Sequence, residues 1–286
     1  MTKFDNTDLD IERYHRRGVI HRDYIAHCFR WSFFVRYTHT RDPSVRVPDV
    51  DGCLRGIHKG WLTDVLDVGC GQDLMLYRAL VSNKVLPRSY TGVDINKLSR
   101  LDEFSGSSLQ PRLFGETDVL SFSTRRIYPH NFVACLEMLE HVPAGYAKKV
   151  VKHLFDGSCP DVTFIVSTPC YNHKAVAANH INEMTRDAFG WMLEEAGWQI
   201  EVNYGTFASK TDIMPYLSED QKQTYKRLMG YYDTNTLSTF YAPLYPEAAR
   251  NNLWVLRKDI PDYTRKFTDP GKEPWASGDD WRDLIN

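Results

Sequence analysis

Two acids and a histidine follow one apolar run closely enough to act together. The run is Phe132 to Leu136, and Glu137, Glu140 and His141 come directly after it. Positions three and four residues apart share one face of a helical turn, so the three side chains can point at a single spot. Two carboxylates and an imidazole are a set of metal ligands. In the structural alternative, Glu140 and His141 cap the next helix, and Glu137 only closes the strand.

The elements that must position these side chains begin at residues 64–71, where an apolar strand runs into an acid and a Gly-x-Gly turn. In an α/β sheet such a turn lies at the carboxyl end of the strand, where ligands bind. Glycines also close ordinary strand-to-helix turns, so the turn alone is a weak signal. A helical pattern over residues 73–82 and a second strand, Tyr90 to Asp94, follow it. This order is typical of a doubly wound sheet that binds a nucleotide.

A dinucleotide-binding fingerprint requires a third glycine where this chain has Leu74. The segment instead resembles the S-adenosylmethionine (SAM) site of class I methyltransferases, over residues 60–205. The resemblance implies a doubly wound, mostly parallel seven-stranded α/β sheet. It also implies cofactor contacts from Asp67, Gly69 and Gly71 at the turn, Asp94 at the ribose, and Asp118 and Val119 at the adenine. The alternative for Asp118 is a helix cap or a turn residue.

A further histidine stands in a loop that should lie beside the acids. The fifth strand, residues 162–166, leads into Ser-Thr-Pro at 167–169, and a loop after it ends in His180. Loops after the fourth and fifth strands are neighbours in this fold, so His180 could complete a four-ligand site. His173 competes because it is nearer to the Ser-Thr-Pro, but no Glu and Thr-Arg follow it. The remaining histidines, among them His27, His130 and His153, have no ligand spacing and are expected at the surface or in helices.

These segments resemble two methyltransferase families. Residues 135–143 closely match the fourth motif of the ubiquinone-biosynthesis O-methyltransferases. The Glu-x-x-Glu-His, the Ser-Thr-Pro and the later His-x-x-Glu-x-Thr-Arg resemble the small-RNA 3′-terminal 2′-O-methyltransferases of the HEN family. Both families place a divalent metal ion on these residues. The resemblance therefore implies Glu137, Glu140, His141 and His180 as metal ligands, with His141 and His180 as catalytic residues.

A metal ion suits methyl transfer to an alcohol, which is a poor nucleophile until its oxygen is polarised or loses its proton. One ion can bind both oxygens of a vicinal diol, so the expected substrate is an RNA or nucleotide ribose, or a small aromatic diol. Carboxylate ligands favour magnesium or manganese, which we expect here, whereas imidazoles favour zinc, iron or cobalt. The alternatives are a metal-free methyltransferase that acts on another nucleophile and a binding module that has lost catalysis.

The composition fits one α/β core with additions, because 286 residues hardly hold two large domains. With 35 Lys and Arg against 37 Asp and Glu, the chain as a whole has no electrostatic signature of a nucleic-acid-binding protein. Six cysteines without paired spacing favour a reducing, cytoplasmic compartment. We expect neither a signal peptide nor a membrane span. The composition does not predict the oligomeric state.

Three parts are expected along the chain. Residues 1–60 form an N-terminal helical extension, residues 61–258 the methyltransferase domain, and residues 259–286 an extended or disordered tail with Trp275 and Trp281 as docking anchors. The extension should contain a basic, aromatic helix that packs its apolar face on the sheet and keeps its arginines solvated, and the alternative is that this helix binds phosphates or a membrane surface. Residues 206–250 form an insertion, interpreted as a substrate lid, whose aromatic residues stack on a base or ring or form a small core. A basic cluster is the candidate site for an anionic partner: Arg13, His15, Arg16, Arg17, His21 and Arg22.

Overall fold

The computed structural model describes residues 22–39, 63–82, 87–98, 110–173, 177–271 and 275–278. Within these residues, seven strands form one sheet in the order β3-β2-β1-β4-β5-β7-β6. The strands are β1 (Asp64–Val68), β2 (Ser89–Val93), β3 (Arg112–Phe114), β4 (Phe132–Leu136), β5 (Thr163–Pro169), β6 (Gln199–Phe207) and β7 (Asn251–Arg257). The first five pair in parallel, and β7 runs antiparallel to both β5 and β6. This confirms the prediction of a mostly parallel seven-stranded sheet.

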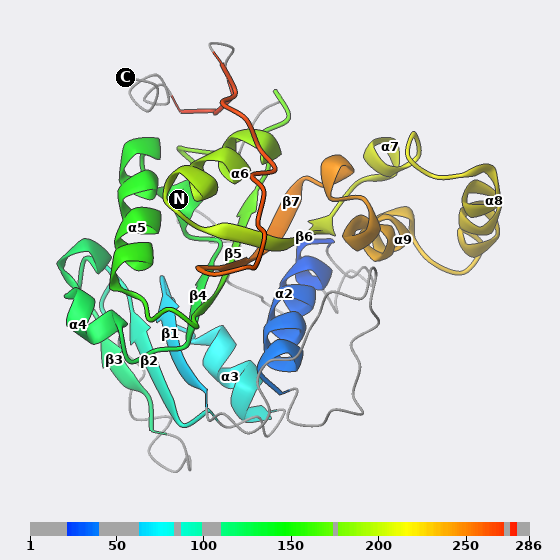
Figure 1. Ribbon diagram of the computed structural model, residues 1–286. Coiled ribbons are helices and arrows are strands. Elements are labelled where there is room, and N and C mark those ends of the chain that lie inside the picture. The colour runs from blue at the N-terminus through cyan, green and yellow to red at the C-terminus, as the bar shows by residue number, and fades with distance from the viewer. Residues whose placement is uncertain are drawn as a thin grey trace.

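Helices cover both faces of this sheet (Figure 1). The α-helices are α2 (Arg22–His39), α3 (Met75–Ser82), α4 (Thr124–Ile127), α5 (Ala144–Gly157), α6 (Arg186–Glu195), α7 (Lys210–Ile213), α8 (Glu219–Leu228) and α9 (Thr234–Tyr241). The described part of the chain also forms short 3-10 helices, which are η2 (Val119–Ser121), η3 (Leu139–His141), η4 (Ala242–Leu244) and η5 (Pro246–Ala248). Because α5 and α6 lie on one face and α2 and α3 on the other, the central strands are buried on both sides and are mainly apolar, although β1 also carries the buried Asp64 and Asp67.

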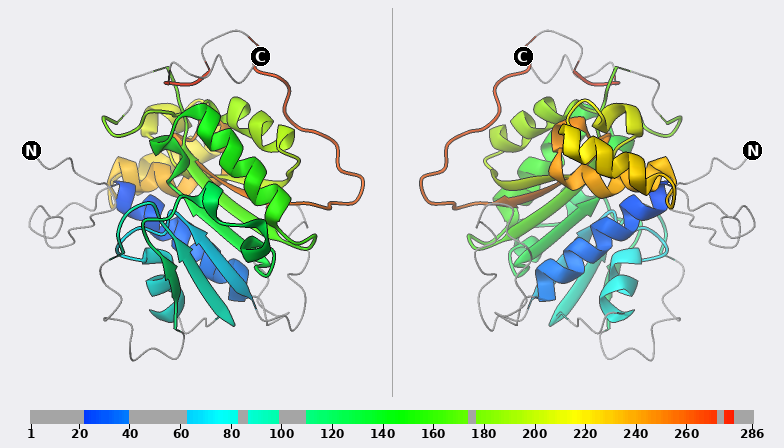
Figure 2. Two further views of the ribbon diagram at one scale, coloured as in Figure 1. Left: turned by 90° about the vertical axis from the view of Figure 1, so that its left-hand side faces the viewer. Right: turned by 90° about the vertical axis from the view of Figure 1, so that its right-hand side faces the viewer.

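The helix α2 packs along the sheet, as expected of the N-terminal extension (Figure 2, right). Its Phe34 and Tyr37 rings meet Phe132 of β4 edge-on, with ring centroids 5.9 and 6.1 Å apart. The expectation that its arginines are solvated is wrong for Arg30, whose residue is only 2% exposed. A buried guanidinium needs acceptors, and this one lies 3.4 Å from the Oδ1 atom of Asn251 on β7. The basic cluster predicted between residues 13 and 22 lies outside the described side chains.

His130 is a second correction, because it lies neither at the surface nor in a helix. His130 is 7% exposed and lies after the end of α4. One ring nitrogen is 3.1 Å from the carbonyl oxygen of Ile127, and the other is 2.9 Å from the hydroxyl of Thr91 on β2. Burial lowers the pKa of His130, so the neutral ring is favoured, and both nitrogens have partners in the interior.

The insertion between β6 and β7 forms a helical subdomain that projects from the end of the sheet (Figure 1). The helices α7, α8 and α9 pack around their own small core, which includes Leu217, Tyr225 and Leu237. Of the two uses expected for its aromatic residues, a small core describes Tyr225, whereas Phe240 is 62% exposed. The interpretation of this insertion as a lid stays a prediction.

The described part of the tail is extended and packs against the domain. Phe267 lies against Trp254 of β7, with ring centroids 5.5 Å apart, and the Tyr263 hydroxyl donates to a carboxylate oxygen of Glu194 on α6. Trp275 is 2% exposed and belongs to the core on the α6 side of the sheet. Trp275 is therefore an anchor, as expected, and it docks onto the chain's own domain, while Trp281 lies outside the described residues.

None of the described helices is long and apolar enough to cross a membrane. No disulfide joins the cysteines that the structure describes, which are Cys28, Cys70, Cys135, Cys159 and Cys170, while Cys53 lies outside the described residues.

Candidate functional site

The turn after β1 closes tightly, and its glycines are required for that. Gly69 and Gly71 have φ angles of +70° and +66°, in the left-handed region that glycine adopts readily. The Gly69 N–H donates to the carbonyl oxygen of Val93 at 2.8 Å, which ties the turn to β2. A Cβ atom on Gly69 would lie 2.6 Å from the Cγ atom of Met138, so a side chain has no room there. The turn thereby brings the backbone of β1 against the segment after β4.

A cavity of about 590 Å³ opens at this turn. Five of the six predicted cofactor residues line it: Gly69, Gly71, Asp94, Asp118 and Val119. Met138 and His141 line the same cavity, so it extends from the glycine turn to the segment after β4. The structure therefore brings together residues that the sequence places on four separate loops. A volume of this size can hold a nucleotide-sized ligand.

Asp94 ends β2 at the edge of this cavity, and its residue is 6% exposed. Its Oδ2 atom accepts from the Gly71 N–H at 2.9 Å, and its Oδ1 atom accepts from the Asn96 N–H at 2.8 Å. These two backbone donors fix the orientation of the carboxylate. Each oxygen has lone pairs left, so Asp94 can also accept hydrogen bonds from ligand hydroxyls.

Asp67 is the next-to-last residue of β1 and lines a second cavity, of about 470 Å³, which shares Gly69 and Gly71 with the first. Its residue is 3% exposed, and the hydroxyl of Tyr90 donates to its Oδ2 atom. Burial raises the pKa of Asp67 to about 7. Asp67 is thus buried next to the glycine turn and hydrogen-bonded to Tyr90, and its contact with a cofactor stays a prediction.

Asp118 has both of the uses weighed for it from the sequence. Its Oδ1 atom accepts from the Leu120 N–H at 2.8 Å, so Asp118 caps η2, and the Tyr146 hydroxyl donates to the same oxygen. The side chain is nevertheless exposed at the 590 Å³ cavity, next to the buried Val119. Capping and cofactor binding are compatible here because a carboxylate has several acceptor positions.

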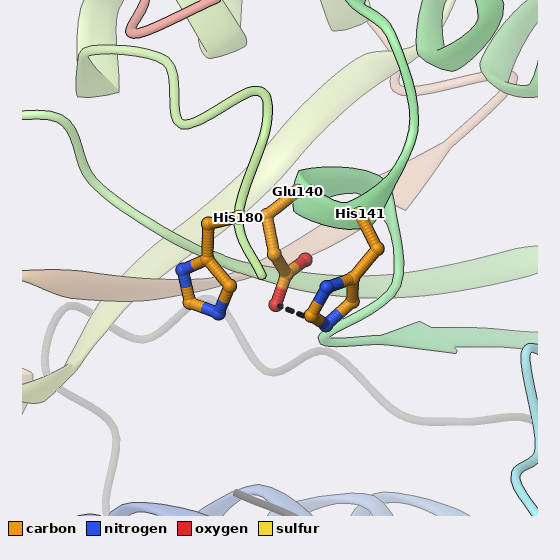
Figure 3. A group of neighbouring side chains, drawn as sticks. All are labelled: Glu140, His141 and His180. Atoms are coloured by element: carbon orange, nitrogen blue, oxygen red, sulfur yellow. Dashed lines mark ion pairs between the residues drawn. The ribbon is translucent and has the colours of Figure 1, made fainter. Parts of the chain in front are cut away.

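Glu140, His141 and His180 converge on one point beside this cavity (Figure 3). Their potential ligand atoms all lie within 4.8 Å of one another. The loop that carries His180 is fastened to η3 because the N–H groups of Ile181 and Asn182 both donate to the Glu140 carbonyl oxygen, at 2.9 and 3.1 Å. The competing candidate His173 is not in the group, and its ring lies tilted against that of Tyr171, with centroids 5.0 Å apart.

Both imidazoles have one nitrogen in a hydrogen bond, which leaves the other for a ligand. The Nδ1 atom of His141 is 2.9 Å from the carbonyl oxygen of Asn179, which can only accept, so this nitrogen carries the proton. The Nδ1 atom of His180 is 2.5 Å from the Oε1 atom of Glu183. Hydrogen bonds of this kind orient metal-binding histidines and fix their tautomer. The Nε2 atom of His141 lies 3.8 Å from Glu140.

Glu140 is the buried acid of the group, with its residue 1% exposed. Its Oε2 atom has no hydrogen-bond partner among the described residues. Burial, followed by the nearby Glu137 carboxylate, raises the pKa of Glu140 well above its usual range. An unpartnered buried carboxylate is stable only when it is protonated or neutralised by a cation. One such oxygen beside two oriented imidazoles fits a divalent metal ion.

Glu137 is held apart from these three residues. Its φ angle is +56°, and its Oε1 atom accepts from the Ser167 hydroxyl at 2.7 Å. Its Oε2 atom accepts from the Asn251 amide at 2.7 Å and lies 3.7 Å from the Arg30 guanidinium. Left-handed backbone at a non-glycine residue is uncommon and is concentrated at functional sites. The assignment of Glu137 as a fourth metal ligand stays a prediction.

Several residues of this site were missed from the sequence. Ser167 and Glu183 lie inside the motifs that were noted, but those motifs indicated no role for them. Arg30 and Asn251 gave no signal, because they are 107 or more positions from Glu137 in the chain and meet it only through the sheet. Asn179 acts through its backbone carbonyl, which has no signature in the side-chain sequence.

The comparisons with known proteins agree with this geometry. A family model described as a methyltransferase domain matches residues 55–202, which is more than half of the chain. No curated protein matches the sequence.

Solved methyltransferase structures are similar to this chain at low identity. The magnesium protoporphyrin IX methyltransferase ChlM from Synechocystis PCC 6803, with bound SAH, is 13% identical, with 88% of this chain and 95% of that chain covered and a TM-score of 0.49. The methyltransferase domain of bacterial CtHen1 is 20% identical, with coverages of 68% and 90% and a TM-score of 0.44. The mitomycin 7-O-methyltransferase MmcR is 10% identical, with 69% of this chain covered and a TM-score of 0.44, and this chain spans about half (49%) of its length. At TM-scores below 0.5 these likenesses carry no conclusion about substrate.

Proposed function

This chain belongs to the methyltransferase-domain family, which places it among the SAM-dependent methyltransferases, and we propose that it methylates a hydroxyl oxygen beside a divalent metal ion. One observation carries the proposal. His141 lines the cavity at the glycine turn and is also a member of the group with Glu140 and His180. A cofactor in this cavity and an ion held by this group would therefore be neighbours, which is what transfer to an ion-bound oxygen requires.

The cofactor would be held by residues of the 590 Å³ cavity. Asp94 is oriented by two backbone N–H groups and can accept hydrogen bonds from the ribose hydroxyls. Val119 presents an apolar surface for the adenine ring, and Asp118 lies beside it as an acceptor for the adenine amine. SAM supplies an activated methyl group, and transfer is a direct displacement in which the new carbon–oxygen bond forms as the carbon–sulfur bond breaks.

The metal ion would be held by Glu140, His141 and His180, with Glu137 as the predicted fourth ligand. When bound, the ion supplies Lewis-acid polarisation of the substrate hydroxyl. Of the two ions expected, manganese fits this group better than magnesium, because two of its three ligands are imidazoles. Asn179 and Glu183 hold the two rings in place, so the chain contributes orientation before any ion arrives.

The proposed metal ion also suggests a class of substrate. A metal ion binds a pair of vicinal oxygens more strongly than a single oxygen. We therefore propose that the substrate is a diol, either a ribose 2′,3′-diol of an RNA or nucleotide or a small aromatic diol. The 470 Å³ cavity beside the glycine turn is lined by charges of both signs, including Arg30, Asp73 and Glu137. It is therefore neither the basic groove expected for RNA nor the closed apolar pocket expected for an aromatic diol.

A metal-free mechanism has one observation in its favour. Burial raises the pKa of Glu140, and a protonated Glu140 needs no cation. His141, with its Nδ1 proton bound to the Asn179 carbonyl, would then present Nε2 as the base that removes the proton from the substrate. This alternative requires no contribution from a metal to turnover.

Metal removal separates the two mechanisms. The full chain is stripped with EDTA, and methyl transfer from radiolabelled SAM is measured before and after addition of Mn²⁺ or Mg²⁺. The acceptors are a short RNA with a free 2′,3′-diol, the same RNA with a 3′-deoxy end, and catechol. We expect turnover to disappear with the metal, to return with Mn²⁺, and to require a vicinal diol. Unchanged turnover after complete metal removal would establish the metal-free alternative, and calorimetry that shows no SAM binding would leave only a binding module.

A further inference from the structure

The C-terminal segment pairs with the loop that carries the His180–Glu183 hydrogen bond. The Glu183 N–H donates to the Ser277 hydroxyl oxygen at 2.8 Å, and the Ser277 N–H donates to the Glu183 carbonyl oxygen at 2.8 Å. The Thr185 N–H donates to the Trp275 carbonyl oxygen at 2.7 Å. Met184, between these residues, forms an antiparallel bridge with Ala276. Residues 275–277 thus act as a short strand added to residues 183–185, and we call them the tail strand.

The tail strand is anchored by burial. Trp275 is 2% exposed and Ala276 is 4% exposed. The Trp275 ring meets Trp191 of α6 edge-on, with centroids 6.4 Å apart. Burying an indole is among the largest single contributions that one side chain makes to packing. The backbone that pairs with Glu183 is therefore held by the core itself.

Glu183 connects this pairing to the candidate metal group. Its Oε1 atom lies 2.5 Å from the Nδ1 atom of His180, and its side chain is 10% exposed. The opposite edge of the same segment is fixed to the residues that follow β5, because the Tyr171 N–H donates to the Met184 carbonyl oxygen at 2.9 Å. Residues 183–185 are therefore held between the end of β5 on one side and the tail strand on the other.

We propose that the tail strand is part of the metal site: by holding the backbone of Glu183, Ser277 positions the carboxylate that orients His180. Ser277 is a positioning residue, since it acts through Glu183 and touches neither ion nor substrate. This inference rests on the proposed function, because it assigns a role to the tail in binding the ion that Glu140, His141 and His180 would hold. It makes a segment almost 100 positions away in the chain a determinant of metal affinity.

Binding of Mn²⁺ alone to the full chain tests the proposal, with free Mn²⁺ measured by electron paramagnetic resonance. Ser277→Ala removes the acceptor for the Glu183 N–H, and we expect about fivefold weaker Mn²⁺ binding, the order that one lost hydrogen bond gives. Ser277→Pro also removes the donor to the Glu183 carbonyl, and we expect about tenfold weaker binding, the lower end for losing an outer partner of a metal ligand. Ser277→Thr keeps the hydroxyl and the N–H and should bind Mn²⁺ as the wild type does.

Two controls separate positioning from general loss of structure. The first is Tyr263→Phe, which breaks a contact of the same tail with Glu194 on α6, away from Glu183. The second is the affinity for SAH, measured by calorimetry, which should stay the same in every variant because the glycine turn does not touch the tail strand.

The outcomes are distinct. Weaker Mn²⁺ binding in Ser277→Ala and Ser277→Pro, with Tyr263→Phe, Ser277→Thr and SAH affinity unchanged, supports the proposal. Wild-type Mn²⁺ affinity in both Ser277 variants would overturn it while leaving the metal site intact, and equal losses in Tyr263→Phe would overturn it as well. If the wild type itself binds no Mn²⁺, the proposed function fails, and the role of the tail fails with it.

Discussion

The carboxyl edge of the sheet has two candidate functional regions, the proposed cofactor site and the proposed metal site, and they are assembled in different ways. In the cofactor region, Gly71 and Asp94 are 23 positions apart and come from adjacent parallel strands. In the metal region, the contact between Glu137 and Asn251 spans 114 positions, and that between Glu183 and Ser277 spans 94. The first region is local and uses backbone donors. The second is joined from segments that meet only in the finished fold.

The two regions also differ in how their buried acids are satisfied. Asp94 accepts two backbone hydrogen bonds, and Asp67 accepts one from Tyr90. Glu140 has a buried oxygen with no partner among the described residues. The cofactor region is therefore complete without its ligand, whereas the metal region has a carboxylate that a cation would satisfy. Variants in one region should leave the function of the other intact.

Loss of a ligand from the metal region should have the largest effect. Glu140→Ala or His180→Ala should lower methyl transfer by more than about 1000-fold, because Lewis-acid stabilisation of a transition state is worth several kcal/mol. SAH affinity, measured by calorimetry, should stay within about twofold of the wild type, since neither residue lines the glycine turn. Equal loss of SAH binding in these variants would show that the two regions are not separate.

Asp67 should make the stability of the cofactor region depend on pH. Its folded pKa of about 7 lies above the ordinary 3.8, so the folded state binds the proton more tightly than the unfolded state. The stabilisation is fully present below pH 3.8 and is lost as the pH rises through about 7, by about 4 kcal/mol at most. Asp67→Asn should remove this loss, as shown by urea unfolding at pH 5 and pH 8. An unchanged difference between the two pH values would contradict the assignment.

Asp94→Ala should weaken binding in the cofactor region alone. Hydrogen bonds to a charged group contribute roughly 1.5–3 kcal/mol, so we expect SAH affinity to fall by about 10- to 100-fold. Mn²⁺ affinity should not change, because Asp94 lies outside the metal group. Asp94→Asn, which keeps an acceptor and loses the charge, is the matched control and should lose less. A parallel drop in Mn²⁺ affinity would couple the two regions.

The smallest expected effect concerns Glu137. Ser167→Ala removes one hydrogen bond to its carboxylate and should lower the free energy of unfolding by about 1 kcal/mol. If Glu137 serves mainly as the anchor for Asn251 and Arg30, Mn²⁺ affinity should stay within about twofold. A rise in Mn²⁺ affinity would instead mean that Ser167 competes with the ion for this carboxylate, and would bring Glu137 into the metal region as predicted.

Much of this architecture was predictable from short segments. The strand that begins at Asp64, the glycine turn and the apolar run Phe132 to Leu136 all depend on neighbours within a few positions, and each appears where it was expected. The edge strand next to β2 was less predictable. β3 was not anticipated, because three residues of mixed exposure carry almost no periodic signal.

The metal region was also predictable only in part. That Glu140 and His141 share one turn followed from their spacing, and His180 was chosen over His173 from the residues that follow it. The buried state of Arg30, the diversion of Glu137 toward Ser167 and Asn251, and the pairing of Ser277 with Glu183 could not be derived in this way.

The linear chain was enough to predict a doubly wound sheet, a cofactor site at the glycine turn and a candidate set of ion ligands. Apolar periodicity and turn residues indicated the strands and the turn, which are local features, and the resemblance to class I methyltransferases implied the rest. Only the tertiary structure determined that Glu140 lies beside the two histidines. It also determined that Ser167 and Asn251 hold Glu137 and that the tail strand supports Glu183. Those outcomes depend on contacts across about 100 positions, where sequence spacing carries no information about distance.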